Sequence, residues 1–198
     1  MEKSGFKAAW CQGDRITKCS FLLMGSSNFL RGQYIKGFIF LSVQIIYIGI
    51  MLTNGFSMLA KLPSLGEAIQ QEVWNEAKGI YEYTAGDQSL LILLFGISIL
   101  FLTIAFFMVY RTNVKSACHV QYLKEKGLAL PTFKQDIKEL FDSRLHVLLL
   151  SAPVTGILVF TILPLIFMIT MAFTNYSKID QHLILFDWVG LKNFIEVL

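Results

Sequence analysis

The stretch Leu90–Tyr110, LLILLFGISILFLTIAFFMVY, decides the fold of this 198-residue chain. It is 21 residues long and contains no Asp, Glu, Lys, Arg or His. About 20 apolar residues, each rising 1.5 Å, cross a hydrocarbon core of roughly 30 Å as a helix. A buried helix in a small soluble protein is rarely so long and so free of charge. The stretch therefore predicts a helix that spans a membrane.

Two further stretches have the same character, Gly37–Leu59 with 23 residues and Val147–Phe173 with 27. The whole chain is 55% hydrophobic and only 16% charged, whereas soluble domains have about 25% charged residues. The sequence therefore predicts an all-α integral membrane protein. It has three transmembrane helices and short amphipathic interfacial helices.

The same composition excludes several classes of protein. A disordered chain needs low hydrophobicity and a high net charge, and this chain has neither. Three cysteines are too few, and an odd number, for a disulfide scaffold. A net charge of +3 is too small to indicate a nucleic-acid partner, so the expected surroundings are membrane lipids.

The positive charges predict the orientation in the membrane. Lys and Arg number 6 before the first span, 2 and 7 in the next two connections, and 2 after the third span. Cytoplasmic segments carry the excess of Lys and Arg, so the N-terminus is expected inside. The expected order is cytoplasmic 1–36, transmembrane 37–59, external 60–89, transmembrane 90–110, cytoplasmic 111–146, transmembrane 147–173 and external 174–198.

The connections carry signals of short helices. Ser64 and Glu67 have capping-box spacing, and the apolar residues that follow every four positions predict an amphipathic helix in the external connection 60–89. Thr132 and Gln135 offer a second capping box, which predicts an amphipathic helix at 132–144 on the cytoplasmic interface. The apolar patch Phe21–Met24 is too short to span and is expected at the inner leaflet.

No catalytic, cofactor-binding or metal-binding residues are predicted, and the chain is not expected to be an enzyme. A catalytic site needs a convergent acid, base and nucleophile, and no glycine-rich phosphate loop is present. The reactive side chains are each better explained in another way. Cys11, Cys19 and the pair Cys118–His119 are expected to be structural or incidental, and His146 and His182 to be interfacial. Asp187 and Glu196 are expected to be solvated carboxylates. Polar residues within the spans, such as Gln44 and Thr103, are expected to join helices.

The third span is long and contains Pro153 and Pro164. Each proline removes a backbone hydrogen bond, so the span is expected to be tilted, bent or extended beyond the bilayer. After it comes Phe173-Thr174-Asn175-Tyr176, and then Val189-Gly190-Leu191-Lys192-Asn193-Phe194.

This proline-containing span, with its F-x-N-Y exit and V-G-x-x-N-F element, resembles the start of the conserved core of binding-protein-dependent sugar ABC importer permeases. The upstream stretches LLMGSSNFLRGQYIKGFIFLSVQI and PTFKQDIKELFDSRLHVLLLSAP are similar to the N-terminal region of the MalF-type maltose/maltodextrin branch. The resemblance covers most of the chain from about Phe21 onward.

The resemblance implies a permease subunit in the plasma membrane of a bacterium. It works with a second permease subunit, cytoplasmic ATPase subunits and an extracellular sugar-binding protein. ATP is expected on the ATPase subunits, and no cofactor is expected in this chain. Permeases of this kind continue for several more spans, which carry the ATPase-docking E-A-A loop and the sugar contacts. The chain is therefore expected to be the N-terminal part of a longer permease, and its substrate-binding residues are unknown.

Two alternatives stay open from the sequence. One is a permease for another solute, such as glycerol phosphate, trehalose or another oligosaccharide. The other is a complete three-span accessory or scaffold membrane protein without a transport role.

Overall fold

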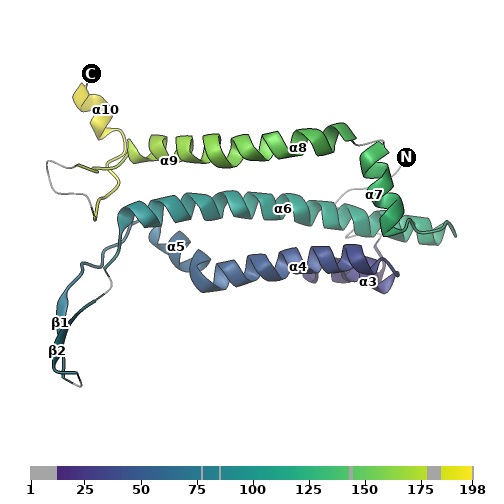
Figure 1. Cartoon of the computed structure of the whole chain (residues 1–198), viewed down its shortest axis with the longest axis horizontal. Coiled ribbons are helices and arrows are strands. Elements are labelled where there is room, and N and C mark those ends of the chain that lie inside the picture. The colour runs from purple at the N-terminus through teal and green to yellow at the C-terminus, as the bar shows by residue number, and fades with distance from the viewer. Residues whose placement is uncertain (1–12, 77, 85, 143–144, 178–183, 198) are drawn as a thin grey trace. The chain divides into compact units, whose positions relative to one another are not determined.

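A computed structural model describes residues 13–76, 78–84, 86–142, 145–177 and 184–197 of the chain. The chain is mainly helical, as predicted, and Figure 1 shows its long helices. The elements in chain order are α2 (Arg15–Leu22), α3 (Ser26–Leu30), α4 (Tyr34–Ile50), a π-helical turn (Met51–Gly55), α5 (Phe56–Lys61), β1 (Glu72–Asn75), β2 (Ile80–Tyr83), α6 (Ser89–Glu125), α7 (Phe133–Asp142), α8 (Leu145–Ile157), a π-helical turn (Leu158–Ile162), α9 (Leu163–Met171) and α10 (Lys192–Val197).

Three helical stretches of the described chain are long and apolar enough to cross a membrane: Tyr34–Lys61, Ser89–Glu125 and Leu145–Met171. Each contains most or all of one predicted span. The second is 37 residues long, so it continues 15 residues past Tyr110 as a polar helix. At 1.5 Å per residue, this extension is about 22 Å long. Gly127, with a φ of 65°, follows its end.

The backbone contacts divide the chain into two compact units. The first contains residues 1–52 and 102–154, and the second contains residues 53–101 and 155–198. In the first unit α4 packs on α6, where the Tyr47 and Phe106 rings stack with centroids 3.9 Å apart. The Tyr47 hydroxyl donates to Thr103 Oγ1 at 3.2 Å. In the second unit the core contains Leu65, Leu93, Ile97 and Phe186.

The predicted amphipathic helix at 132–144 is present as α7, which belongs to the first unit. Its capping box forms, because the Thr132 backbone N–H donates to Gln135 Oε1 at 2.7 Å. In the predicted patch Phe21–Met24, Leu22 and Leu23 are exposed. Phe21 and Leu22 end α2, while Met24 lies in the turn before α3 and is fully buried.

The predicted amphipathic helix in the connection 60–89 is wrong. The structure has an antiparallel hairpin, in which Trp74 pairs with Tyr81 and Glu72 with Tyr83 (Figure 1). Leu65 and Gly66 both have positive φ, so the chain turns where the helix was expected to begin. Ser64 Oγ instead donates to the Lys61 carbonyl, and the Glu67 N–H donates to Asp87. β-Branched and aromatic residues on both sides of Asn75–Gly79 favour strands, and this signal outweighs the four-residue period.

The prolines of the third helix are accommodated without ending it. Pro153 lies inside α8, and the π-helical turn Leu158–Ile162 comes directly before α9, whose first turn contains Pro164. Within that turn the Leu163 N–H donates to the Leu158 carbonyl, which is the wider i→i+5 spacing. A π turn inserts one residue into the helical register. The third helix therefore changes register just before the second proline.

Candidate functional site

The F-x-N-Y and V-G-x-x-N-F elements come together in the second unit, after the end of α9. We call residues 172–176 and 186–194 the motif clasp. The Phe173 carbonyl accepts the N–H groups of Val189 and Gly190 at 2.9 and 3.1 Å. Asn193 Nδ2 donates to the carbonyls of Ala172 and Thr174 at 3.0 and 2.8 Å. The asparagine therefore satisfies carbonyl groups that a helix end leaves without partners.

Two further hydrogen bonds join the two segments of the motif clasp. The Asn175 N–H donates to the Asp187 carbonyl at 3.0 Å, and the Asp187 N–H donates to Asn175 Oδ1 at 2.6 Å. The centroids of the Phe173 and Phe194 rings lie 5.3 Å apart. Each motif residue thus has a structural role. The motif asparagines bond backbone groups, and the phenylalanines pack on each other.

The motif clasp also joins the ends of the other two long helices. Trp188 Nε1 donates to the Leu62 carbonyl, next to the end of α5, at 3.0 Å. Ser89, the first residue of α6, donates its N–H to the Ile184 carbonyl at 2.9 Å and accepts the Phe186 N–H at 3.1 Å. Phe186 is almost fully buried beside them. Within the second unit, the motif clasp therefore fixes the ends of three helices with neutral hydrogen bonds.

A buried polar cluster lies in the first unit, and the sequence analysis did not predict it. We call Asp14, Thr17, Ser27 and Arg31 the Arg31 cluster. The Arg31 side chain is 1% exposed and makes a two-oxygen contact with Asp14 at 2.9 and 3.0 Å. The same guanidinium donates to Thr17 Oγ1 and to the Ala117 carbonyl of α6. The cluster therefore fixes the N-terminal helices to α6.

Neighbouring residues extend this contact between the N-terminal helices and α6. Asn113, which is buried, accepts the Gly25 N–H at 2.8 Å and donates to the Ser20 carbonyl at 3.2 Å. Gly25 and Gly37 approach so closely that a Cβ on Gly25 would lie 2.1 Å from the Gly37 carbonyl oxygen. Gln44, one of the predicted helix-joining residues, accepts the Met24 N–H at 2.8 Å.

Asp14 is held as a carboxylate. Burial by itself raises the pKa of Asp14, but the Thr17 backbone N–H and the Arg31 guanidinium together outweigh it, so the pKa lies below its ordinary value. Asp14 also accepts the Thr17 N–H at 2.8 Å as the N-cap of α2. Sequence patterns could not show the pairing of Asp14 with Arg31, because the two residues are 17 positions apart and cap different helices.

The reactive candidates weighed from the sequence do not converge. Cys19 is exposed and Cys118 half-buried, both as free thiols. Asp187 contributes its backbone to the motif clasp, and Glu196 lies 3.8 Å from Lys192 on the exposed face of α10. Cys11 and His182 lie outside the described residues. In the part of the chain that the structure describes, no group of three or more His, Cys, Asp or Glu residues gathers as metal ligands would.

Three polar residues of the spans bond within their own helix. Ser98, Ser151 and Thr170 each donate to a carbonyl three or four residues earlier. Gln44 and Thr103 join separate elements, as predicted.

The comparison with curated proteins gives the relationship. The chain is 29% identical over 180 residues to the maltodextrin transport system permease protein MalC of Streptococcus pneumoniae, in strains TIGR4 and R6. This chain resembles a maltodextrin permease. The matched region covers 89% of this chain and 38% of MalC, so the chain spans about two fifths of the length of these relatives.

The similarity to a maltodextrin permease confirms the resemblance to permeases of the maltose/maltodextrin branch. No protein-family profile matches the chain. No solved structure matches it either. The similarity includes most of the chain, and so accords with the resemblance first drawn from the motif residues.

Proposed function

We propose that this chain is the N-terminal, membrane-spanning part of a permease subunit in an ATP-driven, binding-protein-dependent carbohydrate importer, with maltose or maltodextrin as its solute. The similarity to MalC over 89% of the chain carries the proposal. Three long apolar helices support a multi-pass membrane protein. The motif clasp supports it further, since the motif residues that carry the resemblance make specific contacts at the end of the third helix.

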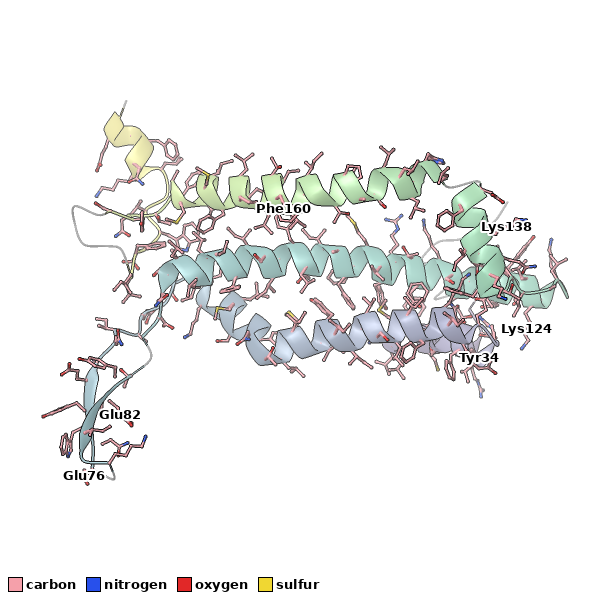
Figure 2. All side chains as sticks on the ribbon, in the orientation of Figure 1. Tyr34, Glu76, Glu82, Lys124, Lys138 and Phe160 are labelled. Atoms are coloured by element: carbon pink, nitrogen blue, oxygen red, sulfur yellow. The ribbon has the colours of Figure 1, made fainter. Side chains whose placement is uncertain are left out.

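The partners of this permease are a second permease subunit, cytoplasmic ATPase subunits that bind ATP, and an extracellular sugar-binding protein. The third helix is consistent with membrane surroundings. Phe160 in its middle is 81% exposed, and Figure 2 shows it standing off the helix. A helix that is apolar on all sides faces lipid or other spans, because exposing its apolar side chains to water is unfavourable.

Uptake in the native bacterium tests the solute. Disruption of the gene should abolish uptake of labelled maltodextrin and leave uptake of labelled trehalose and glycerol phosphate unchanged. Restoring the gene should restore maltodextrin uptake. Loss of trehalose or glycerol phosphate uptake alone would assign the permease to that solute, and unchanged uptake of all three would contradict a transport role for them.

The orientation is tested with an impermeant thiol reagent on a chain without native cysteines. Glu76 in the hairpin connection and Lys124 near the end of α6 are exposed, and Figure 2 labels both. They flank the second span in the chain. We expect Glu76→Cys to be labelled in intact cells and Lys124→Cys only after the membrane is opened. The reverse pattern would contradict a cytoplasmic N-terminus.

A further inference from the structure

The helix α7 has an apolar strip and two polar flanks of opposite charge. At 100° per residue, Phe133, Ile137 and Phe141 share one side of the helix. Lys134 and Lys138 follow along one edge of this strip, while Asp136 and Glu139 lie beyond its other edge.

The structure distinguishes the two charged flanks. Asp136 is held against the start of α4, where its carboxylate lies 2.5 Å from Lys36 Nζ. The connection that leads into α7 is held at the same place, because Gln33 Nε2 donates to the Pro131 carbonyl at 2.8 Å. Both contacts join α7 to residues that directly precede the first apolar span. Asp136 therefore faces the protein, at the boundary where α4 enters the membrane, while Glu139 on the same flank is exposed.

The other side of α7 is left open. Ile137 is 40% exposed and Phe141 is 55% exposed. Lys134 and Lys138 are exposed, and no ion pair joins either ammonium to a described residue. Asp142, one turn after Lys138, is also exposed. Two lysines four positions apart repel each other on a helix, and an anion between them removes that repulsion.

We propose that α7 lies on the cytoplasmic leaflet and that Lys134 and Lys138 bind the phosphate groups of anionic phospholipids, with Ile137 and Phe141 inserted beside the acyl chains. The helix α8, which begins at Leu145, also has exposed apolar residues, among them Leu149 and Leu150, and it belongs to a stretch long and apolar enough to cross a membrane. Lysine beside an apolar face at the start of a span is the arrangement that attracts anionic headgroups. The inference needs only membrane insertion and does not rest on sugar transport.

The test uses the 198-residue chain, with its cysteines changed to serine, in phosphatidylcholine vesicles. A bimane fluorophore at Phe141→Cys reports the local lipid. Its quenching by headgroup-spin-labelled phosphatidylglycerol is compared with quenching by the matching phosphatidylcholine. We expect a several-fold preference for phosphatidylglycerol, since each lysine near an anionic surface contributes about fivefold. The preference should fall in 0.5 M salt, where the screening length is only a few ångströms.

The double variant Lys134→Gln with Lys138→Gln should bring the quenching ratio close to one, and Lys134→Arg with Lys138→Arg should keep it. The matched control is Lys124→Gln with Lys126→Gln, which removes the same charge from the same side of the chain. Lys124 lies near the end of the polar extension of α6, about 20 Å past Tyr110, so this control should keep the preference (Figure 2).

Three results would overturn the proposal. Both lipids could quench the fluorophore of the starting chain equally. The Lys134→Gln, Lys138→Gln variant could keep the preference for phosphatidylglycerol. The Lys124 and Lys126 control could lose that preference to the same extent as this variant. A fluorophore that neither lipid quenches but aqueous iodide does would place α7 against water or a soluble partner, and would also overturn it.

Discussion

The Arg31 cluster and the motif clasp both join helix ends, and they do so by different chemistry. The Arg31 cluster uses a buried cation, a carboxylate and side-chain hydroxyls, and its guanidinium also bonds the Ala117 carbonyl, 86 positions away from Arg31. The motif clasp uses neutral side chains that bond backbone carbonyls and N–H groups. Both are specific, but only the first contains a buried charge.

This difference predicts different tolerance to substitution. A buried charge that loses its partner retains its full desolvation cost, whereas a neutral hydrogen bond at a partly exposed site is partly replaced by water. The first unit should therefore be more sensitive to single changes than the motif clasp. Four measurements test this expectation, in order of decreasing effect.

The largest effect is expected for Gly25→Ala in the first unit. Its φ of 80° disfavours a Cβ by about 1–2 kcal/mol. Overpacking against the Gly37 backbone adds about 1–3 kcal/mol. We expect a loss of about 3–4 kcal/mol in the free energy of unfolding, measured by denaturant titration in detergent. The matched control is Gly190→Ala in the motif clasp, where φ is 61° but space is open, so only about 1–2 kcal/mol should be lost. Equal losses would contradict the close approach of Gly25 to Gly37.

The next effect is expected for Asp14→Asn, which leaves the Arg31 guanidinium without a carboxylate. Removing one partner of a buried pair costs about 3–5 kcal/mol. Asp14 is 48% exposed, so water partly replaces it and we expect about 2–3 kcal/mol in the same titration. The exposed pair Lys78–Glu82 is the control, and Glu82→Gln should cost much less than Asp14→Asn, because solvent screens an exposed pair. A loss no larger than that of the control would show that Arg31 does not need its partner.

A smaller effect is expected for Asn193→Ala in the motif clasp. It removes both side-chain donors to the carbonyls of Ala172 and Thr174, which should cost about 1–2 kcal/mol. Hydrogen exchange at the Val189 and Gly190 N–H groups should become faster by a similar free energy. Lys192→Ala, one residue earlier and exposed, should leave these amides unchanged. Equal protection in both variants would contradict the role of Asn193.

The smallest effect is a pH dependence in the connection between α5 and α6. The Lys61 ammonium, with the N–H groups of Ala68 and Glu67, holds the pKa of Asp87 below its ordinary value of 3.8. Because the folded pKa is lower than the unfolded one, this stabilisation is complete above pH 3.8 and is lost as the pH falls through the folded pKa. Exchange at the Glu67 and Ala68 amides, corrected for intrinsic rates, should rise in that window. Asp87→Asn should remove the pH dependence, and a dependence that persists would assign it to another group.

Hydrophobic clustering in the sequence was enough to predict the fold class. Three long charge-free stretches require helices, because a bilayer leaves backbone groups no other partners. Local signals also worked where they acted alone, as in the capping-box contact between Thr132 and Gln135. They failed after Ser64, where a four-residue apolar period competed with strand-forming residues and the closing of the hairpin decided the outcome.

By itself, the sequence determined that the chain is a three-span helical protein, and its motif residues indicated the relationship to sugar importer permeases. Only the tertiary structure showed that Arg31 is buried against Asp14, and that α7 turns Asp136 to Lys36 and leaves its lysines exposed. The physical reason is that hydrophobic length and capping act between neighbouring residues. The partner of a charge depends on which helices pack together. That packing is decided by contacts between residues many positions apart in the sequence.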